Sequence, residues 1–233
     1  MYHLSAKYYD YIYSFKDYEK ESAILRGMIE TYGRSDGNQL LDVACGTGKH
    51  IEYLREDFEV EGVDLEPEFL KIVQEKFPDL SFYLGDMRTF DLGREFDVVT
   101  CLFSAIGYMQ TVEELNLAIA NMARHLRSGG MLLVEPWISR DKWRDSSVHM
   151  LTVDEPELKI ARVVTSSVEG RTAVMDMHHL IGTPEKTQHF VETHRMFMAT
   201  KEELMDAVQS AGLKASWDEE GLNWRGMLIG VKE

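Results

Sequence analysis

The sequence predicts an α/β fold, in which a mostly parallel and doubly wound sheet carries an added antiparallel lobe. Up to residue 137, short apolar segments alternate with segments of helical periodicity, which is typical of parallel strands joined by crossover helices. Between about residues 148 and 198 the helical periodicity disappears, and strand-like segments follow one another instead. We therefore expect a core of residues 1–137 and 199–233, and an antiparallel insert of residues 138–198.

Five strands are expected in the first part of the core. They are QLLDV at 39–43, FEVEGVDL at 58–65, LSFYLGD at 80–86, FDVVTCLF at 96–103 and MLLVEPW at 131–137. The fourth segment is apolar enough to be buried on both faces, as strands of a covered parallel sheet are.

Helices are expected between these strands. Apolar residues recur at helical spacing over 18–32, and Pro67 begins a helix over 67–77. Thr111 and Glu114 form a capping box for a helix that continues to Leu126, and Gly129 and Gly130 are expected to end it.

The sequence of the insert predicts an antiparallel meander. Residues 158–182 divide into two strands around a turn at Glu169 and Gly170, and residues 186–199 form another strand. A capped helix over 201–212 and a last apolar strand over 226–232 return the chain to the core. Because lobes beyond the carboxyl ends of such a sheet tend to carry substrate, we expect the insert to set specificity or to form a homodimer interface.

Composition disfavours several classes of partner. A net charge of −15 over 233 residues repels phosphate backbones, so no nucleic-acid partner is expected. No apolar segment approaches the ~20 residues needed to cross a bilayer, so no membrane partner is expected. Cys45 and Cys101 are too few for a disulfide framework, which favours a cytoplasmic protein.

The histidines do not predict a metal site. His178 and His179 are adjacent on an expected strand, so their side chains point to opposite faces. His189 and His194 lie in the next strand, and no recognised metal-binding pattern accompanies them.

The segment LLDVACGTG predicts a ligand-binding turn. Gly46 and Gly48 let the backbone approach a ligand closely, and the amides at the start of the following helix favour electron-rich atoms. The dinucleotide fingerprint requires a third glycine, where this chain has Ile51. Asp64 and Asp86 follow the next two strands, so their carboxylates are expected at the same rim. There they suit a ribose and an adenine amine.

Together, LLDVACGTG, VEGVDL and LGDM resemble the class I S-adenosylmethionine (SAM) methyltransferases. The resemblance implies a Rossmann-like sheet of seven strands with the last strand antiparallel, and SAM as the cofactor. Ala44 and Gly46 would line its methionine side, Asp64 would hold the ribose, and Asp86 with Met87 would frame the adenine. The full set of cofactor-binding candidates is Tyr9, Ala44, Gly46, Gly48, Asp64, Leu65, Asp86, Met87 and Phe103.

The resemblance extends along nearly the whole chain to the dTDP-amino-sugar N,N-dimethyltransferases of the desosamine and mycaminose type. It rests on YYD, GDMRTF, FDVVTCLFSAIGYM, ARHLRSGG, VEPW and RGMLIGV. It implies that Tyr9 closes over SAM and that Trp137, Arg162 and Arg225 approach a nucleotide-sugar substrate.

The active-site residues depart from that family at one position. Enzymes of the family have a histidine after the Ser-Ile-Gly segment, whereas this chain has Tyr108 in SAIGYM. An early tyrosine also faces the amine in the family, and Tyr2 is the nearest candidate after a shift of one residue. Tyr108 and Tyr2 are therefore the catalytic candidates.

We expect methyl transfer from SAM to a small-molecule amine, with a dTDP-linked amino sugar as one candidate. Because alignment can supply most of the acceleration, a strong base is not required, and a phenol with a pKa near ~10 is a poor base at pH 7. Four alternatives stay open: methylation of a hydroxyl, methylation of another amine such as glycine, SAM binding without catalysis, and a nicotinamide-dependent oxidoreductase.

Overall fold

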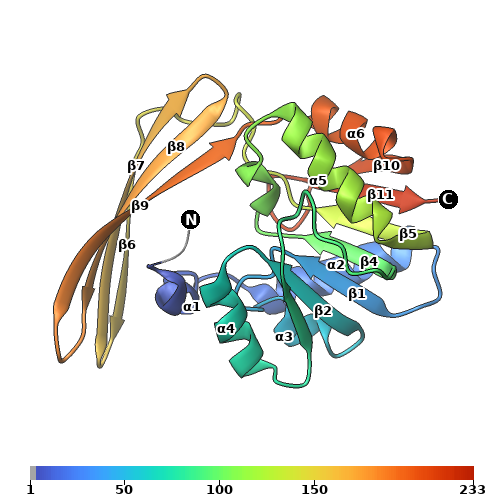
Figure 1. Cartoon of the computed structure of the whole chain (residues 1–233). Coiled ribbons are helices and arrows are strands. Elements are labelled where there is room, and N and C mark those ends of the chain that lie inside the picture. The colour runs from blue at the N-terminus through green and yellow to red at the C-terminus, as the bar shows by residue number, and fades with distance from the viewer. Residues whose placement is uncertain (1–3) are drawn as a thin grey trace.

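The computed structural model describes residues 4–233 and contains two separate β-sheets (Figure 1). The larger is a seven-stranded sheet in the order β10-β11-β5-β4-β1-β2-β3. Its strands are β1 Gln39–Val43, β2 Glu59–Asp64, β3 Ser81–Leu84, β4 Phe96–Cys101, β5 Leu126–Val134, β10 Leu213–Asp218 and β11 Met227–Lys232. Strands β1 to β5 are parallel, and β11 is antiparallel to both of its neighbours. This confirms the predicted class I methyltransferase fold.

Helices cover both faces of the large sheet. On one face lie α2 Tyr18–Tyr32, α3 Ile51–Leu54 and α4 Pro67–Lys76, whose apolar residues share a buried cluster with β1, β2 and β4. On the other face lie α5 Val112–Arg124 and α6 Lys201–Ser210, in a second buried cluster. Neighbouring residues of β1 explain this arrangement, because Leu40 faces the first cluster and Leu41 the second, and both are fully buried.

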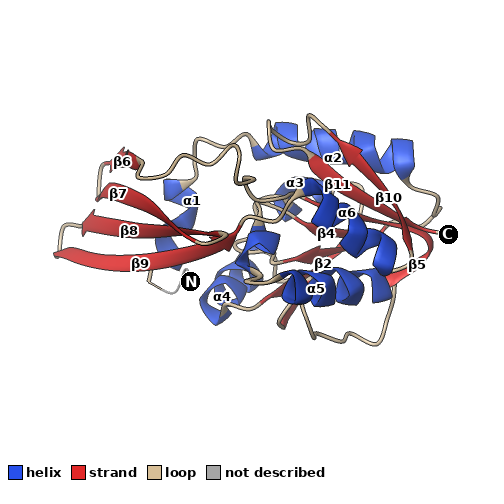
Figure 2. Cartoon of the chain, turned by 90° about the horizontal axis from the view of Figure 1, so that it is seen from above, coloured by secondary structure: helices blue, strands red, loops and turns tan. Residues whose placement is uncertain are grey.

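The small sheet lies beyond one end of the large sheet (Figures 1 and 2). It is antiparallel in the order β6-β7-β8-β9, with β6 Val148–Glu155, β7 Leu158–Glu169, β8 Thr172–Gly182 and β9 Thr187–Phe197. Gly170 has a φ of +61° in the loop between β7 and β8, near the predicted turn. A short 3₁₀ segment, η1 Ala6–Tyr8, and α1 Tyr9–Ile12 pack against the inner face of this sheet. No helix within residues 4–233 is long and apolar enough to cross a membrane.

Some predicted boundaries are wrong. Helix α5 ends at Arg124 rather than at Leu126, and Gly129 and Gly130 lie inside β5 instead of ending the helix. The pairing register of β5 with β4 shifts between Phe96 and Val98, and that irregularity accommodates the glycines, with Gly129 at φ +80°. Strands β6 and β10 were not predicted, because both carry many polar residues; β6 pairs with β7, and β10 pairs with β11 and packs Leu213 into the buried core.

The two glycines of the β1 turn differ in their surroundings. Gly46 (φ +56°) has open space where a β-carbon would stand, whereas a β-carbon on Gly48 (φ +76°) would come within 2.6 Å of Val73 and 2.8 Å of Phe77. Gly48 is therefore the site at which the turn packs on α4, and Gly46 leaves room on the opposite side.

We predict that Gly48→Ala destabilises the protein more than Gly46→Ala does. Both substitutions place a β-carbon at positive φ, which costs about 1–2 kcal/mol, but only the first also overpacks buried side chains, for a further loss of about 1–3 kcal/mol. The free energy of unfolding in urea measures both losses. Equal losses would contradict the packing described for Gly48.

Candidate active site

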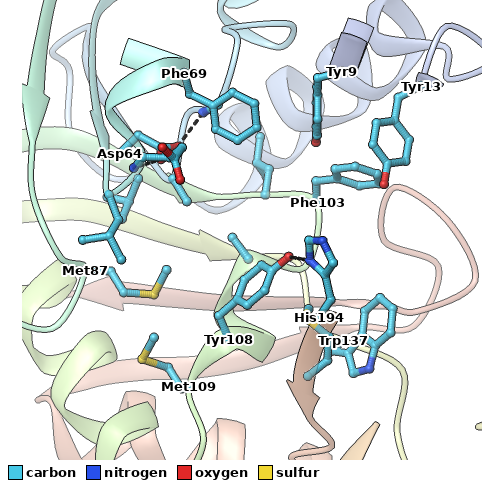
Figure 3. A pocket seen from close by; sticks show the side chains of 18 of the residues that line it. Tyr9, Tyr13, Asp64, Phe69, Met87, Phe103, Tyr108, Met109, Trp137 and His194 are labelled. Carbon is cyan, nitrogen blue, oxygen red and sulfur yellow. Dashed lines mark hydrogen bonds between the residues drawn. The ribbon is translucent and has the colours of Figure 1, made fainter. Parts of the chain in front are cut away.

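A cavity of about 730 Å³ opens beyond the carboxyl ends of β1, β2 and β4 (Figure 3). The β1 turn, the end of β2 and the segment after β3 line one side, and the loop after β4, helix α1 and the inner face of the small sheet line the other. Most predicted site residues line it, namely Tyr9, Ala44, Gly46, Asp64, Leu65, Asp86, Met87, Phe103, Tyr108, Trp137 and Arg225. Among the described residues that were predicted, Gly48 and Arg162 do not line it, and Tyr2 lies outside the described residues.

Asp64 forms the base of the glycine turn. One of its carboxylate oxygens accepts a hydrogen bond from the amide of Gly46 and the other from the amide of Glu66, each at 2.8 Å. The side chain is nearly buried, and burial raises the pKa of Asp64 in spite of these donors. The carboxylate therefore ties the end of β2 to the β1 turn and lies at the cavity wall.

A second carboxylate lies on the same rim, at the end of β3. Asp86 accepts hydrogen bonds from the backbone amide of Arg88 at 2.9 Å and from its Nε at 3.0 Å. Arg88 also donates to Glu114 at 2.6 Å. The Arg88 side chain lowers the pKa of Asp86 through these hydrogen bonds, so this carboxylate is ionised and fixed in orientation. Leu65 and Met87 provide apolar surface beside it.

The N-terminal helix α1 covers the cavity and is attached to the glycine turn. The hydroxyl of Thr47 donates to Asp10 at 2.5 Å, and Lys76 of α4 donates both to Asp10 and, at 3.1 Å, to the carbonyl of Thr47. Tyr9, next to Asp10, places its ring centroid 5.1 Å from that of Phe69. The YYD segment gives no sequence signal for the role of Asp10, because the partners of Asp10 lie far away in the chain.

The loop after β4 is held in an unusual backbone conformation. Phe103 and Ser104 have φ of +50° and +61°, a region that residues other than glycine rarely adopt. The fully buried Glu135 accepts from the amide of Phe103 at 2.6 Å, and Arg225 donates to the hydroxyl of Ser104 at 2.8 Å. These contacts hold Phe103 against Tyr13, whose ring centroid is 5.0 Å away.

The predicted substrate-binding residues occupy different positions. Trp137 lines the cavity, and the guanidinium of Arg225 lies 5.5 Å from its ring centroid while pairing with Glu135 at 3.3 Å. Arg162 donates to the hydroxyl of Tyr13 at 3.0 Å. Since Tyr13 lines the cavity and Arg162 does not, Arg162 supports a wall residue from behind.

Tyr108 has a hydrogen-bonding partner that sequence reasoning missed. Its hydroxyl lies 2.6 Å from Nδ1 of His194, and both residues line the cavity (Figure 3). His194 is 1% exposed, and burial lowers its pKa to about 4. In the sequence His194 was considered only as a metal ligand. The alternation of β9 offered the missing signal, since His194 shares a face with the buried Met196.

Known methyltransferases resemble this chain in sequence. A family model described as a methyltransferase domain matches residues 40–130. The chain is 35% identical over 218 residues to the dTDP-3-amino-3,4,6-trideoxy-alpha-D-glucopyranose N,N-dimethyltransferase of Streptomyces venezuelae, covering 93% of this chain and 92% of that protein. It is also 35% identical over 230 residues to the dTDP-4-amino-2,3,4,6-tetradeoxy-D-glucose N,N-dimethyltransferase of Saccharopolyspora spinosa, covering 97% and 92% of the two proteins.

Solved structures of related enzymes superpose on nearly the whole of this chain. DesVI from Streptomyces venezuelae superposes with a TM-score of 0.91 at 34% identity, covering 99% of this chain and 98% of that one. SAM-bound CalS10, an amino pentose methyltransferase from Micromonospora echinaspora, superposes with a TM-score of 0.84 at 36% identity, covering 94% and 92%. With these matches, the chain belongs to the dTDP-amino-sugar N,N-dimethyltransferase family, and it is an enzyme that uses SAM as its methyl donor.

Proposed function

We propose that this enzyme transfers the methyl group of SAM to the amine of a dTDP-linked deoxy amino sugar. The observation that carries the proposal is the continuity of one cavity, which extends from Asp64 and Asp86 at the large sheet to Trp137 and the inner face of the small sheet. Its volume of about 730 Å³ lies within the ~300–1,000 Å³ range of sites for small molecules and cofactors. The relatives act on substrates of this class, as their names state.

The cavity fits SAM at its large-sheet end. Open space beside Gly46 leaves room for a ligand against the backbone, and the buried Asp64 offers acceptor oxygens to the ribose hydroxyls. For the adenine we propose Asp86 with Leu65 and Met87, and for the methionine part Ala44 and Gly46. Tyr9 and Phe103 would cover the bound cofactor, which supplies an electrophilic methyl group on a sulfonium.

The residues of this chain contribute alignment and exclusion of water. The acceptor nitrogen must be neutral to attack, and its lone pair forms the new bond as the carbon–sulfur bond breaks; the product ammonium then releases a proton. Holding the nitrogen in line with the methyl group contributes up to ~11 kcal/mol in favourable cases, so no strong base is needed. The aromatic cover of Tyr9, Phe69 and Phe103 keeps water from the reacting atoms.

An anionic substrate needs cationic side chains in the cavity wall. Of the described residues, the lysine and arginines that line it are Lys16, Arg88 and Arg225, and each is paired with a carboxylate. We propose that Arg225, which keeps further donors beyond its bonds to Ser104 and Glu135, contacts the diphosphate and that Trp137 packs on the sugar nucleotide. For Arg162 we propose the indirect role of fixing Tyr13.

We propose that the insert, residues 138–198, serves both substrate binding and dimerisation, and the two faces of the small sheet support this. Its inner face lines the cavity, while its outer face exposes Val148, Met150, Leu180 and Val191 to between 42% and 71%. The pairing registers put these four side chains on one face. We propose that this outer face, with its four exposed apolar side chains, meets its copy in a homodimer.

We predict that Met150→Lys lowers the dimer fraction in sedimentation equilibrium, because it buries a charge in the proposed interface. Leu117→Lys is the matched control, since Leu117 is a similarly exposed apolar residue on α5 of the core. A monomeric wild-type chain, or equal effects of both variants, would contradict the dimer proposal.

The ribose assignment predicts that Asp64→Ala and Asp64→Asn weaken SAM binding at least tenfold, because each removes a charged acceptor worth about 1.5–3 kcal/mol. Calorimetric titration with SAM measures the change. Asp36→Ala changes an exposed carboxylate that precedes β1 and does not line the cavity, and it should leave the affinity unaltered. Wild-type affinity in both Asp64 variants would remove this assignment.

The acceptor is tested with a coupled assay for S-adenosylhomocysteine over a panel of substrates. We expect turnover with dTDP-linked amino deoxysugars and none with glycine, free amino sugars or dTDP-sugars that carry a hydroxyl in place of the amine. Turnover of the hydroxyl compounds or of glycine alone would overturn the proposal in favour of the other acceptors. SAM binding without turnover of any compound would favour a protein that binds SAM without catalysis.

A further inference from the structure

We propose that His194 is a positioning residue that acts through Tyr108: its imidazole accepts a hydrogen bond from the phenol, so that the oxygen of Tyr108 faces the acceptor amine as a hydrogen-bond acceptor. The inference rests on the proposed function, since it concerns the amine at that same site. The contact that carries it is the 2.6 Å separation between the Tyr108 hydroxyl and Nδ1 of His194.

The two residues come from separate segments, the loop after β4 and strand β9, and meet inside the cavity. Tyr108 ends η2, the 3₁₀ segment Ala105–Tyr108, directly after the left-handed residues Phe103 and Ser104. His194 lies on the inner face of β9, where its neighbours in the cavity wall are Met175, Met177 and Met196. A second link holds the same segments together, because the side chain of Gln110 donates to the carbonyl of Arg195 at 3.0 Å. The Tyr108–His194 and Gln110–Arg195 contacts together fix the position of the phenol relative to the imidazole.

The surroundings of His194 leave its imidazole uncharged, and we assign Nδ1 as its accepting nitrogen. Burial among methionines lowers the pKa of His194 to about 4, so its imidazole is neutral at physiological pH. A neutral imidazole has one nitrogen that accepts and one that donates. With Nδ1 as acceptor, the single proton of the Tyr108 hydroxyl is directed at His194 and away from the substrate.

The direction of that proton matters for the reaction. A phenol that donated to the amine would occupy the nitrogen lone pair, which has to attack the methyl carbon. A phenol that donates a hydrogen bond to His194 instead accepts a hydrogen bond from an N–H of the amine and leaves the lone pair free. His194 thereby sets the orientation of the nucleophile without touching it.

The same burial argues against proton storage on His194. A histidine with a pKa of about 4 is a much weaker base than an alkyl amine, so the product ammonium does not transfer its proton to His194. The role that the structure supports is a fixed hydrogen bond, not general-base catalysis.

The kinetic test is a double-variant cycle with a dTDP-amino sugar that the wild type turns over. Tyr108→Phe and His194→Leu should each lower kcat about ten- to hundredfold, which corresponds to one well-aligned hydrogen bond, with little change in the affinity for SAM. In the Tyr108→Phe background, His194→Leu should cause no further loss. His194→Asn, whose amide oxygen can take the place of Nδ1, should retain most of kcat.

A matched control separates this role from simple packing. His179 on β8 is also 1% exposed, stacks on Phe190 with ring centroids 4.8 Å apart, and does not line the cavity. His179→Leu should therefore leave kcat within about twofold. Losses at Tyr108 and His194 that multiply in the double variant, or an equal loss in His179→Leu, would overturn the proposal.

A spectroscopic test does not depend on the acceptor. Nitrogen NMR of the labelled protein should show His194 as a neutral imidazole with Nδ1 unprotonated, and the Nδ1 resonance should shift in Tyr108→Phe. A protonated Nδ1 would overturn the proposal even if the enzyme methylates an amino sugar. If instead no acceptor amine is turned over, the proposed function fails, while an unprotonated Nδ1 still supports the bond to Tyr108.

Discussion

The hydrogen bonds between Asp64 and the β1 turn are the interaction on which the rest of the site depends. Gly46 adopts a left-handed conformation that exposes its amide, and the nearly buried carboxylate at the end of β2 accepts from it. A buried carboxylate without such donors would be strongly unfavourable, so the turn and the acid stabilise one another. Because the floor of the cavity is made of backbone held in this way, ligand groups can approach it without displacing side chains. The cover is attached to the same place, since Asp10 of α1 accepts from Thr47 in that turn.

The opposite wall depends on a second buried carboxylate. Two consecutive residues, Phe103 and Ser104, have positive φ, and such residues cost of order 1–3 kcal/mol each. Glu135 and Arg225 offset that strain through hydrogen bonds to the same two residues. The strained loop leads directly into the segment that ends at Tyr108. The ion pair between Glu135 and Arg225 therefore fixes the positions of the Tyr108 phenol and the Phe103 ring relative to the end of the cavity proposed for the cofactor.

Both carboxylate arrangements bear on the proposed binding of a cationic cofactor and an anionic substrate by an acidic protein. With a net charge of −15, the protein has no general attraction for a nucleotide diphosphate. The cationic residues that line the cavity instead sit in pairs with carboxylates, which fixes their orientation and leaves part of their donors for a ligand. At the end of the cavity proposed for SAM, by contrast, aromatic rings and carboxylates line the wall, and these favour a positive charge such as its sulfonium.

The sequence by itself determined the fold class, the glycine turn and the rim positions of Asp64 and Asp86, because these depend on local periodicity and on where parallel strands end. Only the tertiary structure decided that β6 and β10 are strands, that Arg162 lies behind Tyr13, and that His194 reaches Tyr108 from 86 residues away. The physical reason is the range of the interactions involved. Helical spacing, turn geometry and strand alternation act over a few residues, whereas edge-strand pairing and contacts between two sheets form only when distant segments pack together.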